Sequence, residues 1–188
     1  MDEEKIKLII EAKNGNKNAL DKLVKSEQNN IYLMLYYLKK DNVDINDITQ
    51  EILLKLSAKI SQLKNPKYFK TWLNQIVINS YFDYLRKNKK YTKELKLEDL
   101  SKEVIYNIPD YEINPQSSIL NNELDYVIKT SINNLPIRYK IPITLREIQG
   151  LSYDEISNIT KTNVGTVKSR IARARAKIKD DILKYSGE

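Results

Sequence analysis

The sequence predicts an all-α chain organised as two small helical domains joined by a linker. Three observations favour this fold class. Glycine and proline, which interrupt helices, are scarce, with four and five residues in a chain of 188. Apolar residues recur at spacings of three and four over long stretches, and the strict alternation typical of strands is almost absent.

The N-terminal domain, residues 1–90, is expected to contain three helices. The first covers residues 18–38. The second covers residues 46–63, where apolar residues recur in steps of four and then three, so one face is buried. Asn65-Pro66 ends it, because a residue before proline avoids the α conformation. The third covers residues 68–87 and carries the apolar side chains Phe69, Trp72, Leu73, Ile76, Val77, Phe82 and Leu85.

The segment that follows has a different composition. Residues 94–125 hold eight acidic residues against two lysines, a net charge of −6, with two prolines and little periodicity. This composition is typical of a linker, which we place at residues 91–118, and a mobile loop without a role is the plainer alternative. The C-terminal domain, residues 119–188, is expected to contain helices over residues 119–134, 138–149, 153–160 and 163–184.

Composition excludes several classes of site. The chain has no cysteine and no histidine, so disulfides, Cys/His zinc sites and Cys–His or Ser–His nucleophiles are ruled out. The glycine positions allow neither a P-loop nor a dinucleotide fingerprint. We expect no metal, no cofactor and no small-molecule substrate. The longest apolar run, residues 31–38, is far shorter than the ~20 residues that cross a bilayer, and no signal-peptide pattern is present, which favours a cytoplasmic protein.

Positive charge is concentrated in two blocks, one in each domain. Residues 161–179 contain seven basic residues and no acid, and residues 64–90 contain seven basic residues and one acid, Asp83. The acidic segment separates the blocks. Two tethered basic surfaces fit a partner that carries a long line of phosphates, whereas one block alone is as readily a solvated helix face.

A helix-turn-helix is predicted from residue 150 to residue 175. Ser152 is a good N-cap, and Glu155 three residues later completes a capping box. A short turn at Lys161-Thr162 leads to Asn163, which caps the second helix. The buried stripe of that helix is Val164, Val167, Ile171 and Ala174.

The outer face of the second helix is expected to contact DNA, since this helix enters the major groove in the helix-turn-helix arrangement. Lysine donates to guanine acceptors, serine donates or accepts, and at least one arginine is expected to touch only phosphate. An ordinary helical hairpin with solvated arginines is the alternative. The expected contact residues are Thr166, Lys168, Ser169, Arg170 and Arg173.

Two segments of this domain resemble the minus-thirty-five-reading domain of bacterial sigma factors of the small extracytoplasmic-function group. They are LSYDEI at residues 151–156 and VGTVKSRIARAR at residues 164–175, and LPIRYKIPITLRE at residues 135–147 is similar to the group's lead-in helix. Two positions depart from the pattern. Lys161 stands where the turn commonly has glycine, and Ser157 where the first helix commonly has alanine. A lysine in the left-handed region costs roughly 1 kcal/mol.

The N-terminal domain resembles the same family in the segment NDITQEILLK, residues 46–55, which is similar to the sigma segment that docks on the clamp helices of RNA polymerase. Asp47, Gln50 and Glu51 lie at positions i, i+3 and i+4, so they share one exposed helical face. A plain solvent-exposed face is the alternative. The resemblance implies that the core-polymerase contacts are Asp47, Ile48, Gln50 and Glu51.

A further segment, YFKTWLNQIVIN at residues 68–79 followed by DYLRK at residues 83–87, is similar to the family's minus-ten-reading and strand-opening segment. Duplex opening requires surfaces that stack on unpaired bases, at about 1–3 kcal/mol per base, and cations for the backbone. The loop at residues 62–70 is a candidate pocket for a flipped base. Helical spacing makes Trp72 more typical of a core residue than of a stacking surface, whereas Tyr68 and the loop cations are better placed for contact. The expected contacts are Lys67, Tyr68, Lys70, Trp72, Asn79, Arg86 and Lys87.

The resemblance implies a sigma factor that binds core RNA polymerase and directs promoter recognition, DNA melting and transcription initiation at a specialised regulon. It implies no enzymatic activity, and it implies an anti-sigma partner, often membrane-anchored. One alternative is a stand-alone helix-turn-helix regulator, which would bind its operator without polymerase. The other is a small carboxylate-based helical enzyme, for which the sequence supplies no paired inward-facing acids.

Overall fold

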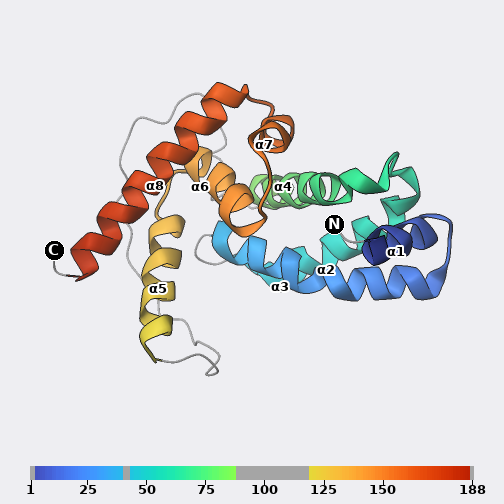
Figure 1. The fold of residues 1–188 in the computed structure, drawn as a ribbon. Helices are drawn as coiled ribbons and strands as arrows, with labels where there is room; N and C mark the ends of the chain where they lie inside the picture. The colour runs from blue at the N-terminus through green and yellow to red at the C-terminus, as the bar shows by residue number, and fades with distance from the viewer. Residues whose placement is uncertain (1–2, 40–42, 88–118, 187–188) are drawn as a thin grey trace.

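A computed structural model describes residues 3–39, 43–87 and 119–186, and within these ranges the chain is helical and contains no strand. Figure 1 shows an N-terminal module, residues 3–87, on one side and a C-terminal module, residues 119–186, on the other. The prediction of an all-α fold is confirmed. The predicted linker at residues 91–118 lies outside the described residues.

The N-terminal module consists of α1 (Glu3–Lys13), α2 (Lys17–Leu38), α3 (Ile45–Lys59), η1 (Ile60–Gln62), η2 (Pro66–Tyr68) and α4 (Phe69–Lys87). Side-chain caps set where two of these helices begin. The Asn16 side chain accepts a hydrogen bond from the backbone N–H of Ala19 at 3.1 Å, and the Asp44 side chain accepts one from Asn46 at 2.9 Å. The three predicted helices therefore begin and end within a few residues of their expected positions, although the last turn of the second is a 3₁₀ turn.

The core of this module lies where the apolar faces of its helices meet. The stripe predicted for α3 and η1 is buried along its whole length. From α4, Phe69 and Tyr81 are fully buried, and the Tyr81 hydroxyl donates to the carbonyl of Leu38 at 2.5 Å, which satisfies its polar end. This bond fixes the end of α2 against α4. The module therefore presents the outer faces of α3 and α4 as defined surfaces.

Helix α1 was not predicted from the sequence. Five of its eleven residues are apolar, but only Ile9 and Ala12 are buried. The helix is held on α2 by packing and by an ion pair of 2.6 Å between Lys5 and Glu27. Gly15, at a φ of +90°, then reverses the chain into α2. The contacts that stabilise α1 come from another helix and are not visible in its own periodicity.

The C-terminal module consists of α5 (Ile119–Asn133), α6 (Ile137–Ile143), the π-helical turn η4 (Thr144–Ile148), α7 (Tyr153–Thr160) and α8 (Val164–Ser186). The single helix expected over residues 138–149 is thus divided. Pro142 lies inside α6 and has no N–H to donate to the hydrogen bonds of a regular α-helix. The π-helical turn η4 follows directly after α6. Gly150, at a φ of +62°, then directs the chain into α7.

Candidate nucleic-acid and polymerase interfaces

Helices α7 and α8 form the predicted helix-turn-helix. The capping box is present at the start of α7: the Glu155 N–H donates to the Ser152 hydroxyl at 3.2 Å, and the Ser152 N–H donates to the Glu155 carboxylate at 2.8 Å. At the start of α8, the Asn163 side chain accepts from the Thr166 N–H at 2.7 Å. Both predicted caps are therefore confirmed, and they fix the ends of the two helices that meet at the turn.

The turn between these helices departs from ordinary backbone geometry at one residue. Lys161 has a φ of 55° and a ψ of 36°, the left-handed conformation that glycine adopts without strain. Ser157, the other departure from the family pattern, donates its hydroxyl hydrogen to the carbonyl of Thr162 at 2.5 Å. The serine thus stabilises the same turn that the lysine strains.

Replacing this strained residue is expected to stabilise the fold. We predict that Lys161→Gly raises the free energy of unfolding by about 1 kcal/mol, because glycine removes the left-handed penalty and the lysine is exposed. Urea denaturation followed by circular dichroism measures the change. The matched control is Lys177→Gly in the middle of α8, which is expected to lower stability by about 1 kcal/mol. A loss of stability for Lys161→Gly would show that the turn has another conformation.

The outer face of α8 presents the residues expected to contact DNA. Val167, Ile171 and Ala174 are buried against the module, as predicted, whereas Val164 is only half-buried. Lys168, Ser169 and Arg173 are exposed, and Thr166 and Arg170 are half-buried. The structure thus brings all five predicted residues to the open side of the recognition helix or its edge.

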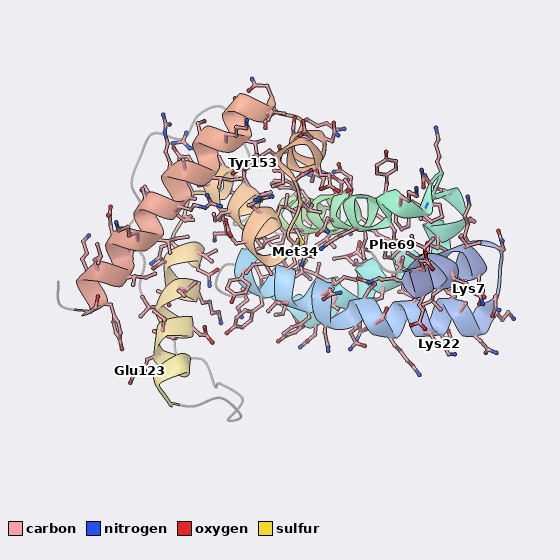
Figure 2. All side chains as sticks on the ribbon, in the orientation of Figure 1. Lys7, Lys22, Met34, Phe69, Glu123 and Tyr153 are labelled. Atoms are coloured by element: carbon pink, nitrogen blue, oxygen red, sulfur yellow. The ribbon has the colours of Figure 1, made fainter. Side chains whose placement is uncertain are left out.

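Several cations of this module are already held by protein groups. Tyr153 lies where α7 meets α8 (Figure 2), with the Arg146 guanidinium 4.9 Å and the Lys168 ammonium 5.7 Å from its ring centroid. A hydrogen bond from Arg173 lowers the pKa of the Tyr139 hydroxyl below its ordinary value, although burial acts the other way. Arg173 therefore lies next to a buried tyrosine of α6 while its own side chain is exposed.

Arg175 is fixed more firmly still. Its guanidinium donates twice to one carboxylate oxygen of Glu147, at 2.6 Å and 3.1 Å. An arginine held in this way is less available to read a base edge, which agrees with its omission from the expected contacts. Arg175 lies on the surface, so the guanidinium N–H groups that do not bond to Glu147 can still contact a phosphate.

Helix α4 carries a polar face along its length. Trp72, Asn79 and Arg86 recur every seven residues, so they lie on one face over about 21 Å of helix. Asn79 and Arg86 are exposed, and Trp72 is half-buried with its ring centroid 6.0 Å from that of Phe69. The Asn79 side chain accepts from Gln75 at 3.0 Å, and Arg86 pairs with Asp83. Trp72 therefore combines core packing with a surface edge.

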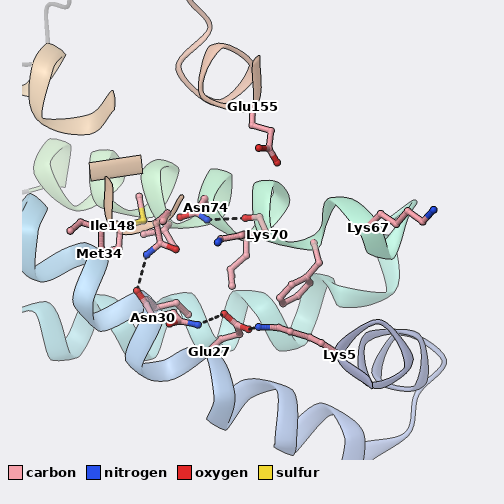
Figure 3. Close-up of a pocket in the computed structure, with 14 residues that line it drawn as sticks. Lys5, Glu27, Asn30, Met34, Lys67, Lys70, Asn74, Ile148 and Glu155 are labelled. Atoms are coloured by element: carbon pink, nitrogen blue, oxygen red, sulfur yellow. Dashed lines mark hydrogen bonds and ion pairs between the residues drawn. The ribbon is translucent and has the colours of Figure 1, made fainter. Parts of the chain in front are cut away.

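The other predicted minus-ten residues do not share this face. Lys67 and Tyr68 belong to η2, and Tyr68 is 64% exposed. Lys70 is exposed one turn later but lines a cavity shared with the C-terminal module, and Lys87 ends α4 at its far end. The predicted set is thus divided into a cluster at η2, a stripe along α4, one lysine that lines the cavity with the other module (Figure 3) and one lysine at the C-terminal end of α4.

The predicted polymerase-docking face lies on α3. Asp47 and Gln50 are exposed, and Glu51 is half-buried beside Lys55, with which it forms an ion pair of 2.6 Å. Ile48 does not lie on this face: it is 1% exposed in the core, so it supports the helix from beneath. The prediction that Ile48 contacts a partner directly therefore does not agree with its position.

Sequence reasoning missed one residue of this face. Leu54 is 71% exposed, and it lies three residues after Glu51 and seven after Asp47, on the same side of α3. An apolar residue at the edge of a polar face was visible in the sequence as an interruption of the polar pattern. It marks the place where a partner would bury apolar surface.

Among residues 3–39, 43–87 and 119–186, no group of three or more Asp and Glu side chains is placed to hold a metal ion. None of the helices in these ranges is both long and apolar enough to cross a membrane.

Comparison with known proteins identifies the family. Sigma-70 region 2 matches residues 23–91, and Sigma-70, region 4 matches residues 127–178. The chain is 34% identical to the ECF RNA polymerase sigma-E factor of Haemophilus influenzae, over 93% of each chain. It is 30% identical to the Escherichia coli protein of the same description, over 93% of this chain and 92% of that one.

Solved structures share the fold. CnrH, in a complex with the cytosolic domain of CnrY, matches 94% of this chain with a TM-score of 0.64 and 21% identity, and covers 95% of that chain. The Bartonella quintana sigma factor RpoE, in a complex with the anti-sigma factor NepR, matches 86% of this chain with a TM-score of 0.63 and 20% identity, and covers 95% of that chain. With matching regions in both modules and relatives of this identity over nearly its whole length, the chain belongs to the extracytoplasmic-function sigma factors of RNA polymerase, and it directs transcription initiation at promoters.

Proposed function

We propose that this sigma factor docks on core RNA polymerase through α3, opens and reads the minus-ten element with η2 and α4, and reads the minus-thirty-five element with α8. The observation that carries the proposal is the placement of one acidic and two basic surfaces on separate elements of one chain. An acidic face lies on α3, and two basic faces lie on different modules. Residues 1–90 then form the core-binding and melting domain, residues 91–118 the linker, and residues 119–188 the minus-thirty-five domain.

Within α8, the position of a residue along the helix determines whether it reaches a base or a phosphate. Residues near the N-terminus of a recognition helix reach base edges, whereas later residues meet the phosphate backbone. Lys168 and Ser169, both exposed in the first turns of α8, are therefore the base-reading candidates, with Thr166 and Arg170 beside them. Arg173, exposed farther along α8, is placed to bind phosphate.

Within the N-terminal module, Tyr68 is the best-placed group for an unpaired base. Its ring is exposed at the end of η2, next to Lys67. The ring can therefore rotate toward a base with little loss of buried surface. The stripe of Trp72, Asn79 and Arg86 continues from it along α4 with an aromatic edge, an amide and a cation. Stacking surfaces next to cations are what single-stranded DNA requires.

The docking face on α3 combines charge with an apolar anchor. Asp47, Gln50 and Glu51 offer negative and polar groups that fit a positively charged helical partner. Leu54 adds a large apolar side chain at the edge of this group. Interfaces commonly draw most of their affinity from one such anchor surrounded by polar contacts.

Removing that anchor gives a clear expected result. We predict that Leu54→Ala weakens binding to core polymerase by roughly ten-fold, since an exposed leucine in the free protein becomes buried only in the complex. Fluorescence anisotropy of the labelled protein titrated with core polymerase measures the affinity. Ile10→Ala, which removes a 42%-exposed apolar side chain from α1, is the control and is expected to leave affinity unchanged. Equal affinities for Leu54→Ala and the parent would exclude Leu54 from the interface.

Partners beyond polymerase and promoter are proposed from the related structures. The RpoE structure holds an anti-sigma factor, and we propose that this chain is also restrained by an anti-sigma protein and that this partner is membrane-anchored. We place the protein in the cytoplasm, where polymerase acts, and assign it no catalytic activity of its own.

Promoter binding with and without polymerase tests the proposal. The sigma factor is expected to bind a promoter duplex weakly and with little preference when alone, and specifically when core polymerase is present. Electrophoretic mobility shifts with a promoter fragment and a scrambled fragment measure both. A stand-alone helix-turn-helix regulator would instead bind its site tightly and specifically with no polymerase, and that result would contradict the proposal.

A further inference from the structure

Arg138, in the first turn of α6, belongs to none of the three proposed surfaces. Its side chain is half-buried, and its guanidinium carbon lies 4.9 Å from the ring centroid of Tyr139. The Nε atom of Arg138 is buried and has no hydrogen-bond partner among the residues that the structure describes. A buried donor without a partner is costly, and more so when it belongs to a charged group. This guanidinium therefore has an N–H group left to donate.

Tyr139 brings a second arginine to the same place. Helix α6 packs against α8 (Figure 1), and Tyr139 is only 8% exposed. The pKa of the Tyr139 hydroxyl is lowered first by a hydrogen bond from Arg173 of α8 and then by the charges of both arginines, although burial opposes them. Tyr139 therefore lies within reach of guanidinium groups from two different helices.

No carboxylate of the described part of the chain neutralises these two arginines. Arg175 forms an ion pair of 2.6 Å with Glu147, whereas neither Arg138 nor Arg173 forms one with any described residue. Like charges beside a buried ring repel each other more strongly than in open water, because the effective dielectric constant is lower. An anion that binds both guanidinium groups would remove this repulsion.

Phosphate is the anion that this arrangement fits best. The planar guanidinium presents N–H groups in a fork that matches phosphate oxygens, and a tyrosine hydroxyl adds another donor. The Arg173 side chain is exposed on α8, as are the base-reading candidates Lys168 and Ser169. Arg173 follows Ser169 by four positions, or ~6 Å along the helix. The backbone of a duplex whose bases touch Ser169 would thus pass close to the two arginines.

We propose that Arg138, Tyr139 and Arg173 form a binding site for one phosphate group, and that in the promoter complex this group belongs to the backbone of the minus-thirty-five element. The assignment to DNA rests on the proposed function, whereas the phosphate site itself does not. The site extends the DNA interface from α8 to α6. Because phosphate contacts position a recognition helix without reading sequence, this site holds α8 in place while Lys168 and Ser169 read bases.

Neutralising the DNA backbone at single positions tests the site on promoter DNA. A methylphosphonate, which replaces one charged phosphate by a neutral group, is moved stepwise through the minus-thirty-five element. Mobility shifts measure the affinity of the complete polymerase–sigma complex for each DNA, with the parent protein and with Arg138→Gln. The variant is expected to lose roughly ten-fold in affinity on unmodified DNA, since it removes a charged hydrogen-bond donor. At one backbone position, the methylphosphonate should weaken the parent but have no further effect on Arg138→Gln.

The loss should also be independent of base sequence. Arg138→Gln is expected to reduce affinity by the same factor on the native element and on an element with one base substitution, whereas Lys168→Gln should change the discrimination between them. Unequal losses for Arg138→Gln would show that Arg138 reads a base. Additive losses at every methylphosphonate position would show that it contacts no phosphate. Either result would overturn the assignment to the DNA backbone.

Inorganic phosphate tests the site without DNA. The free full-length protein is titrated with sodium phosphate at constant ionic strength, and the ¹⁵N–¹H signals of the arginine Nε–H groups are followed by NMR. The signals of Arg138 and Arg173 are expected to shift saturably. The signal of Arg86, which pairs with Asp83 in the other module, is the internal control and should not shift.

The two experiments together separate the sources of phosphate. Saturable shifts with no backbone position coupled to Arg138 would assign the site to a free phosphate ion and overturn its assignment to DNA. Neither shifts nor coupling would overturn the site altogether. Coupling without shifts would support a site that takes only backbone phosphate. If the parent complex does not bind the promoter, the proposed function fails, and the phosphate titration alone decides whether the site exists.

Further variants separate phosphate binding from net charge and from folding. Lys184→Gln removes one positive charge from the last turn of α8 and is expected to keep the parent affinity and the parent response to every methylphosphonate. Tyr139→Phe keeps the buried ring but removes the hydroxyl, so a several-fold loss is expected. Arg138→Lys keeps the charge without the fork and should retain part of the affinity. If circular dichroism shows that Arg138→Gln has lost its helices, the same methylphosphonate scan with Arg138→Lys decides.

Discussion

Reversing two charges on α3 is expected to reduce affinity for core RNA polymerase by roughly 100-fold or more. The variant carries Asp47→Lys and Glu51→Lys. Like charges placed against a positive partner cost several kcal/mol across an interface, whereas the Glu51–Lys55 pair that is lost within the protein is exposed and contributes little to stability. Anisotropy titration with core polymerase measures the loss, and circular dichroism checks that the helices are retained.

The control for this variant makes the same change of charge elsewhere. Glu3→Lys with Glu4→Lys alters two exposed acids in the first turn of α1. If both variants lose affinity equally, the effect belongs to net charge and not to α3. If the α3 variant keeps the parent affinity, α3 is not the docking surface.

Removing the exposed aromatic ring of η2 is expected to impair strand opening about 5- to 150-fold. Tyr68→Ala deletes a side chain that is 64% exposed, so the fold loses little, while each stacked base contributes about 1–3 kcal/mol. Permanganate reactivity of unpaired thymines in the polymerase–promoter complex measures opening directly. Binding to the minus-thirty-five element should not change, because α8 is untouched.

Tyr126→Ala provides the comparison for that prediction. Tyr126 is 40% exposed on α5, outside the expected minus-ten surface. Normal permanganate reactivity is expected for it. Reactivity at the parent level in Tyr68→Ala would remove this tyrosine from the melting surface and leave the stripe on α4 as the remaining candidate.

Local chemistry explains why the helix-turn-helix was predictable in detail. Caps and turns depend on residues three or four apart, so Ser152 with Glu155, and Asn163 with Thr166, could be read from spacing alone. The strain at Lys161 followed instead from the family resemblance, because Lys161 stands where the turn of that family commonly has glycine. These features involve no distant part of the chain.

Other features depend on contacts that spacing does not contain. Helix α1 is held by an ion pair to α2, and Ile48 is directed inward by the packing of α3, although its neighbours Asp47 and Gln50 face outward. A resemblance to a docking segment cannot separate residues that touch a partner from those that support them. Burial does separate them, and it also revealed Leu54.

The contacts between modules were the least predictable. The Thr71 hydroxyl donates to the Glu155 carboxylate at 2.5 Å, yet the two residues are 84 positions apart, and neither has an unusual neighbourhood in the sequence. Lys70 was assigned to the minus-ten surface as a cation of the segment that resembles the family's minus-ten region, yet in the structure it lines the cavity. The role of a residue at a domain boundary depends on how the two domains pack together. The periodicity of a single helix contains no information about that packing.

Run-off transcription with purified core polymerase is the most direct test of the central claim that this chain directs initiation. Templates would carry promoter fragments from the same genome, with core polymerase alone as the reference. Adding the protein should produce transcripts of defined length that core polymerase alone does not make, and the α3 charge-reversal variant should not produce them. Identical products with and without the protein, across the promoter fragments of that genome, would contradict the account.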